Sequence, residues 1–159
     1  EEFGSPKAAD LKSIQGKAEL VRRSMIIGVV LDSLGLCKLP ALCLICTYDL
    51  VAEAELVTAL LGQAVDVSGL FSAGERIVNL ERLFNLRHGA CAADDRLPEM
   101  FFDKDYNAGK EPSKPYEWME PMIREFYQIM GWDETGHPGA EKLQEFGLPP
   151  VPSAKKPAA

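Results

Sequence analysis

Residues 17–34 are apolar on almost every face of a helix, and this run most constrains the fold of the 159-residue chain. A helix that is apolar on most faces is buried by other elements. Crossing a membrane needs about 20 consecutive apolar residues. Here the run is interrupted by Gly28 and flanked by charges at Arg22, Arg23 and Asp32. The sequence therefore predicts a core helix over 17–34.

The sequence Asp32-Ser33-Leu34-Gly35-Leu36-Cys37 closes this helix. Gly35 supplies the left-handed residue that commonly ends a helix, and Leu36 can then fold back onto the last turn. Asp32 fits a simple helix end poorly, because a carboxylate in the last turn faces the negative end of the helix dipole at a cost of about 0.3–1 kcal/mol. We therefore expect a hydrogen-bond donor at Asp32. Cys37 follows in irregular backbone, where its thiolate is free to face a metal.

A second helix is predicted over 49–64, and a third is predicted to open at Ser72-Ala73-Gly74-Glu75. These four residues form a capping box, in which the serine and glutamate side chains satisfy each other's backbone amides. The third helix ends near Arg87. We expect its charges (Glu75, Arg76, Glu81, Arg82) to be mostly solvated, and the following apolar residues to face inward: Ile77, Leu80, Leu83 and Phe84.

Residues 90–113 show little apolar periodicity and are predicted to form a long ordered loop. Pro115 is typical of a helix start, and the helix it opens ends at Gly131. We expect its inner face to carry an aromatic and methionine stripe, and a short helix to follow that ends at Gly147. The inner-face residues are Trp118, Met122, Phe126, Ile129 and Met130.

Period-two alternation is never sustained, so the predicted fold class is all-α: a domain of about four to five helices with long ordered loops. We expect residues 1–15 to be an irregular lead-in. Because the start lacks an initiator Met, two alternatives are open: the chain is a fragment of a longer polypeptide, which we favour, or its first residues come from a tag. Residues 16–148 would be the folded domain, and residues 149–159, rich in Pro, Ala and Lys, a mobile tail.

The net charge of −7 argues against nucleic acid or an anionic membrane as a partner. No secretion signal is visible, which favours a cytoplasmic location. The four cysteines are Cys37, Cys43, Cys46 and Cys91. Cys43 and Cys46 lie in an apolar string and are expected to be small buried residues. The alternative, a metal site built from all four cysteines, matches no zinc-ligand spacing.

The Asp32–Cys37 turn and the string Gly74-Glu75-Arg76-Ile77-Val78-Asn79-Leu80-Glu81-Arg82-Leu83-Phe84-Asn85 resemble the C-terminal part of the aldehyde:ferredoxin oxidoreductase family of tungstopterin enzymes. The resemblance extends over residues 16–148. It implies that Asp32 contacts the pterin and that Cys37 is the fourth ligand of a 4Fe-4S cluster. Gly35 and Leu36 would form the backbone that brings Asp32 and Cys37 together. The family's other three ligands, in a Cys-x-x-Cys-x-x-x-Cys motif, are absent from this chain.

The resemblance further implies a tungsten or molybdenum pterin (molybdopterin-type) oxidoreductase, in which this chain is the C-terminal, cofactor-contacting domain. Such an enzyme oxidises aldehydes or reduces carboxylate-level substrates, with ferredoxin or another electron-transfer protein as partner. The remaining domains of the same enzyme would be further partners, and a homo-oligomer is possible. We expect the isolated chain to bind no cofactor and to be inactive. Alternatives are a helical interaction module, an inactive fragment, or a subunit of a ring-reducing acyl-CoA complex.

Overall fold

The protein is described here by a computed structural model that covers residues 5–10, 13–39, 49–102 and 115–151. The chain forms five α-helices in these ranges and no β-strand, apart from one isolated bridge between Trp132 and Pro138. The all-α prediction is confirmed. The elements in order are η1 (Pro6–Ala9), α1 (Lys17–Ser33), α2 (Val51–Leu61), α3 (Val67–Arg87), η3 (Ala92–Asp94), η4 (Glu99–Phe102), α4 (Pro115–Met130) and α5 (Ala140–Glu145).

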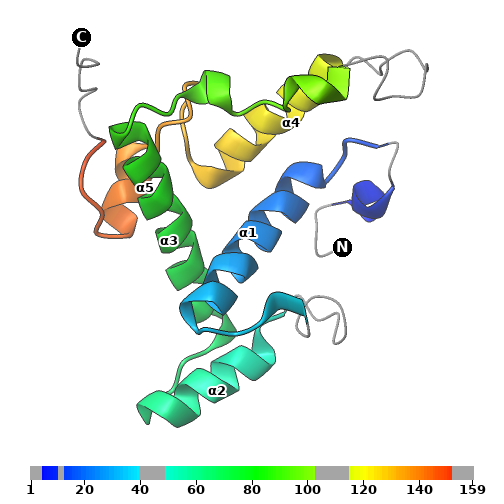
Figure 1. Cartoon of the computed structure of the whole chain (residues 1–159). Helices are drawn as coiled ribbons and strands as arrows, with labels where there is room; N and C mark the ends of the chain where they lie inside the picture. Colours follow the sequence, from blue (N-terminus) through cyan, green and yellow to red (C-terminus); the bar gives the residue numbers. More distant parts are fainter. Residues whose placement is uncertain (1–4, 11–12, 40–48, 103–114, 152–159) are drawn as a thin grey trace.

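Helix α1 is the centre of the fold, and it packs against both α3 and α4 (Figure 1). Its buried residues belong to two apolar clusters. Ile27, Val30 and Leu31 meet residues of α2 and of the start of α3, while Ile26 meets Val78 of α3 and Met130 of α4. The predicted core helix is therefore present, although part of its surface is exposed at Val21 and Met25.

Glycine positions end three helices as the sequence predicts. Gly35, Gly131 and Gly147 all have positive φ values, of 69°, 67° and 59°, and each lies just beyond its helix. The long loop after α3 contains the short helical turns η3 and η4 in its described part.

The predicted start of α3 is wrong. The helix begins five residues earlier, at Val67, and its N-cap is Asp66, whose side chain accepts a hydrogen bond from the Gly69 amide at 2.7 Å. Ser72 lies inside the helix. The expected capping box does not form because Asp66, not Ser72, is the N-cap, and the Glu75 carboxylate instead pairs with Arg22 of α1 and Lys142 of α5.

The predicted faces of α3 are also partly wrong. Arg76 and Glu81 are exposed as expected, but Glu75 and Arg82 are buried, together with Asn79. Among the residues expected to face inward, Leu83 is buried, but Leu80 is 43% and Phe84 61% exposed. The charged side chains point inward because cations and carboxylates from other elements pair with them, as described below.

Several predictions lie outside the described residues, including those on Cys43 and Cys46, on the side chain of Trp118 and on most of the tail. No helix in the described ranges is both long enough and apolar enough to cross a membrane.

Candidate functional site

The turn after α1 has the geometry of a Schellman helix end, with its paired backbone hydrogen bonds. The Leu36 amide donates to the Leu31 carbonyl at 2.9 Å, and the Gly35 amide donates to the Asp32 carbonyl at 3.1 Å. Leu36 packs back onto the buried cluster of α1 and α2. A Cβ added at Gly35 would meet no atom within 4 Å, so the outer side of the turn is open. The backbone thus fixes the positions of Asp32 and Cys37 and leaves space beside them.

The donor expected at Asp32 is present within the chain itself. Lys38 Nζ lies 2.7 Å from Asp32 Oδ2, and the side chain of Lys38 passes over Gly28 of α1. Both ends of this ion pair are substantially exposed, so the pair contributes little to stability. Lys38 therefore positions the Asp32 carboxylate at the surface. A stronger hydrogen-bond donor can replace the Lys38 ammonium group there, or bind the carboxylate beside it.

Cys37 is exposed and not in a disulfide. It lies in irregular backbone between Leu36 and Lys38, as the sequence predicts. Cys91 is also exposed and free, but it caps the turn η3, and its backbone amide donates a hydrogen bond to the Asp94 carboxylate at 2.8 Å. In the described ranges no group of three or more His, Cys, Asp or Glu side chains could hold a metal ion. Cys37 can therefore supply one thiolate, and any cluster it binds must take its other ligands from elsewhere.

A polar network that the sequence pattern does not reveal joins the helices. Arg82 of α3 donates from Nε to the Gly136 carbonyl at 2.8 Å and, through its two Nη atoms, to both Asp95 oxygens at 3.1 and 2.8 Å. The Tyr127 hydroxyl also donates to Asp95. Burial and this bond to a carboxylate raise the pKa of Tyr127 to about 12. The network ties α3, α4 and two loops together.

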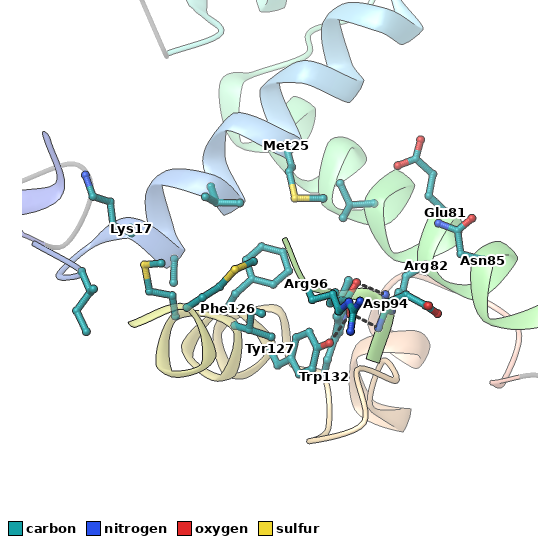
Figure 2. A pocket seen from close by; sticks show the side chains of 18 of the residues that line it. Lys17, Met25, Glu81, Arg82, Asn85, Asp94, Arg96, Phe126, Tyr127 and Trp132 are labelled. Atoms are coloured by element: carbon teal, nitrogen blue, oxygen red, sulfur yellow. Dashed lines mark hydrogen bonds and ion pairs between the residues drawn. The ribbon is translucent and has the colours of Figure 1, made fainter. Parts of the chain in front are cut away.

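A cleft of about 990 Å³ opens beside this network, between α1, α3 and α4 (Figure 2). Its walls are mostly apolar. The apolar lining includes Val21, Met25, Met119, Met122 and Phe126. Figure 2 shows Met25 and Phe126 on the apolar side and Arg82 at the polar end, with the ring of Tyr127 close by. Met122 and Met130 of α4 were predicted to be core: Met130 is fully buried, whereas Met122 lines the cleft and so has an open side that sequence periodicity does not reveal.

The glycine turn after α1 exposes both a hydrogen-bond acceptor, Asp32, and a soft metal ligand, Cys37, and these two residue types could hold a cofactor. Residues 1–148 match the family described as aldehyde ferredoxin oxidoreductase, domains 2 and 3. The chain belongs to this family.

Similar proteins include tungsten-containing aldehyde ferredoxin oxidoreductases of three archaea. The Pyrococcus furiosus protein is 37% identical over 123 residues, which is 75% of this chain and 19% of that protein. The Pyrococcus horikoshii protein is 32% identical over 151 residues, 92% of this chain and 24% of the relative. The Thermococcus kodakarensis protein is 35% identical over 111 residues, which is 67% of this chain and 18% of that protein. The chain thus spans about a fifth of the length of these relatives. No solved structure shows a significant match to it.

Proposed function

We propose that this chain is the cofactor-contacting, C-terminal domain of a tungsten or molybdenum pterin enzyme that oxidises aldehydes or reduces carboxylate-level substrates. The observation that carries this proposal is the Schellman turn, which presents Asp32 and Cys37 outward in a chain of this family. The named relatives are tungsten-containing aldehyde ferredoxin oxidoreductases, which supports tungsten as the metal and ferredoxin as the electron partner.

The residues of the turn fit such a cofactor in their chemistry. The Asp32 carboxylate only accepts hydrogen bonds when ionised, and a pterin offers amine donors. Cys37 provides the thiolate that iron–sulfur clusters require. When bound, the metal and the cluster supply the electron-transfer chemistry. The chain's own part is to hold the acceptor and the thiolate at a fixed separation, which the backbone hydrogen bonds of Gly35 and Leu36 achieve.

The rest of the same enzyme is the first partner of this domain. The side chains of Leu80 and Phe84 lie one helical turn apart on α3 and are exposed. Large exposed apolar side chains that lie together are typical of an interaction surface. The same observation supports the second candidate function, a helical interaction module, in which this surface would bind a partner without any cofactor.

Replacing Asp32 by Asn in the full-length enzyme tests the pterin contact. The change keeps the size of the side chain and removes the charge, and the helix dipole favours the neutral form. We expect less tungsten per polypeptide, measured by mass spectrometry after anaerobic purification, and an unchanged unfolding midpoint. The matched control is Glu55→Gln on the exposed surface of α2. Wild-type tungsten content and aldehyde oxidation in the Asn variant would overturn the assignment of Asp32.

A further inference from the structure

The cleft between α1, α3 and α4 lies on the face of α1 that carries Asp32. Its lining residues on this helix include Ala18, Val21 and Met25, and the series continues to Gly28 and Asp32. The spacings alternate between three and four residues, so these positions share one side of the helix. From Met25 to Asp32 the distance along the helix axis is about 10 Å. The cleft therefore points along α1 toward the proposed cofactor contact.

The polar groups at the inner end of the cleft are already paired inside the chain. Arg82 is bound by Asp95 and the Gly136 carbonyl, and the Trp132 indole donates to Asn79 at 2.8 Å. The charged side chains that line the cleft are balanced, with three cations (Lys17, Arg82, Arg96) and three carboxylates (Glu81, Asp94, Asp95), so a charged ligand of either sign meets no net opposite charge. A charged occupant would lose its hydration without compensation. The occupant that fits is therefore uncharged and mostly apolar.

The walls are suited to an adaptable small-molecule site. Met25, Met119 and Met122 all line the cleft, and methionine side chains adjust to apolar ligands of different shape. The volume of about 990 Å³ is at the upper end of the range for small-molecule sites, about 300–1,000 Å³.

We propose that this cleft binds the hydrocarbon chain or ring of the substrate, an uncharged group attached to the carbonyl that reacts at the cofactor. This inference rests on the proposed function for the identity of the ligand as a substrate. The apolar wall binds the carbon chain, and the face of α1 directs its reactive end toward Asp32. The domain would thus select aldehydes with long or aromatic carbon groups over short ones.

The first test uses octan-1-ol, an unreactive probe with the chain of a long aldehyde, and the 159-residue chain labelled with ¹³C at its methionine methyls. Of the five methionines, three line the cleft, whereas Met100 is exposed outside it and Met130 is fully buried. We expect saturable NMR shifts of the three cleft methyls and no comparable shift of the other two. Ethanol at the same concentration controls for solvent effects. The absence of saturable shifts, or equal shifts at Met100, would overturn the proposal.

A matched pair of variants locates the binding. Val21 lines the cleft and is 48% exposed, while Val51 of α2 is 47% exposed and lies outside it. Val21→Phe fills part of the cleft and should weaken octan-1-ol binding about tenfold, whereas Val51→Phe should leave it unchanged. Because both side chains are about half exposed, both variants should fold, which circular dichroism checks. Equal binding by the two variants would contradict the location.

The second test separates this inference from the proposed function. In the full-length enzyme, Val21→Phe should raise the KM for octanal about tenfold and leave the KM for acetaldehyde unchanged. If the wild-type enzyme holds no tungsten and oxidises neither aldehyde, the proposed function fails. If it oxidises both and Val21→Phe alters neither KM, or both equally, only the substrate role of the cleft fails. If, in addition, octan-1-ol binds the isolated chain, the cleft would instead bind an apolar segment from another part of the enzyme.

Discussion

Glu75 is a carboxylate buried between two cations from different helices. Arg22 of α1 approaches one oxygen at 2.6 Å, and Lys142 of α5 approaches the other at 3.1 Å. Each cation also has a second carboxylate, Glu19 for Arg22 and Glu145 for Lys142. Sequence patterning places charged residues outside, and only the three-dimensional contacts show that this one is compensated inside. The predicted solvated face of α3 was wrong at Glu75 for this reason.

Replacing Glu75 by Gln should destabilise the fold. The change removes the negative charge that Arg22 and Lys142 both contact. A hydrogen bond to a charged group contributes about 1.5–3 kcal/mol, but each cation keeps its second carboxylate. We expect a loss of the free energy of unfolding of about 2 kcal/mol, measured by urea denaturation. Glu81→Gln, an exposed change on the same helix, should alter stability by less than about 0.5 kcal/mol. Equal stability of the two variants would contradict the buried ion-pair description.

Tyr127 makes the stability of the fold depend on alkaline pH. Its pKa is raised from 10.0 to about 12, first by burial and then by its hydrogen bond to Asp95. Between these values the unfolded state has lost a proton that the folded state keeps, so stability falls as the pH rises from about 10 to about 12. Below pH 10 both states carry the proton and this contribution is fully present.

The measurement is an ultraviolet titration of the folded chain, with urea unfolding at pH 9 and pH 11. We expect one tyrosine to ionise near pH 12, and Tyr127→Phe to remove that ionisation and to reduce the loss of stability between the two pH values. A Tyr127→Phe variant that loses as much stability as the wild type would contradict this assignment.

At the scale of elements, the crossing of α1 and α3 depends on a helical glycine. A Cβ at Gly74 would lie 2.8 Å from the Cγ2 atoms of Ile26 and Val30 and 2.9 Å from the Ile26 carbonyl oxygen. At Gly28, in the same pair of helices, the nearest atom is the side-chain Nζ of Lys38, at 3.6 Å. The two glycines therefore differ in the space beside them, although both lie inside helices.

Alanine at these two positions should have opposite effects. Gly74→Ala should lower the free energy of unfolding by about 1–3 kcal/mol, because the methyl group overpacks the crossing. Gly28→Ala should raise it by up to about 1 kcal/mol, through the better helix propensity of alanine. Thermal and urea unfolding of both variants checks this. A Gly74→Ala variant as stable as Gly28→Ala would show that the two helices are not packed so closely.

Helix existence and helix ends were largely predictable from local sequence. Gly35, Gly131 and Gly147 end their helices by positive φ, a local property that the sequence shows directly. The start and the rotation of α3 were not predictable, because Asp66 and Ser72 are both plausible N-caps. In the structure Asp66 is the N-cap, and Glu75 pairs with cations of α1 and α5, which local sequence does not show.

At the scale of the whole molecule, the proposed site would be one wall of a larger site. The turn that carries Asp32 and Cys37 was predictable because a Schellman end needs only a glycine and a following apolar residue. Lys38 as the partner of Asp32, and the cleft along the same face of α1, were not predictable, because they depend on how side chains pack around Gly28 and α4. The chain spans about a fifth of the length of its relatives, and under the proposed function the other walls of the site would come from the rest of the enzyme.

The central claim is that Cys37 supplies a thiolate to an iron–sulfur cluster. The most direct measurement is the iron content and the electron paramagnetic resonance spectrum of the full-length enzyme with Cys37→Ser, compared with Cys91→Ser. Both cysteines are exposed and free, which makes the second variant a matched control. Because an alkoxide is a poor substitute for a thiolate on iron, we expect Cys37→Ser to lose iron or to change the cluster spectrum. Cys91→Ser should match the wild type. A Cys37→Ser enzyme with wild-type iron content and an unchanged cluster spectrum would contradict the claim.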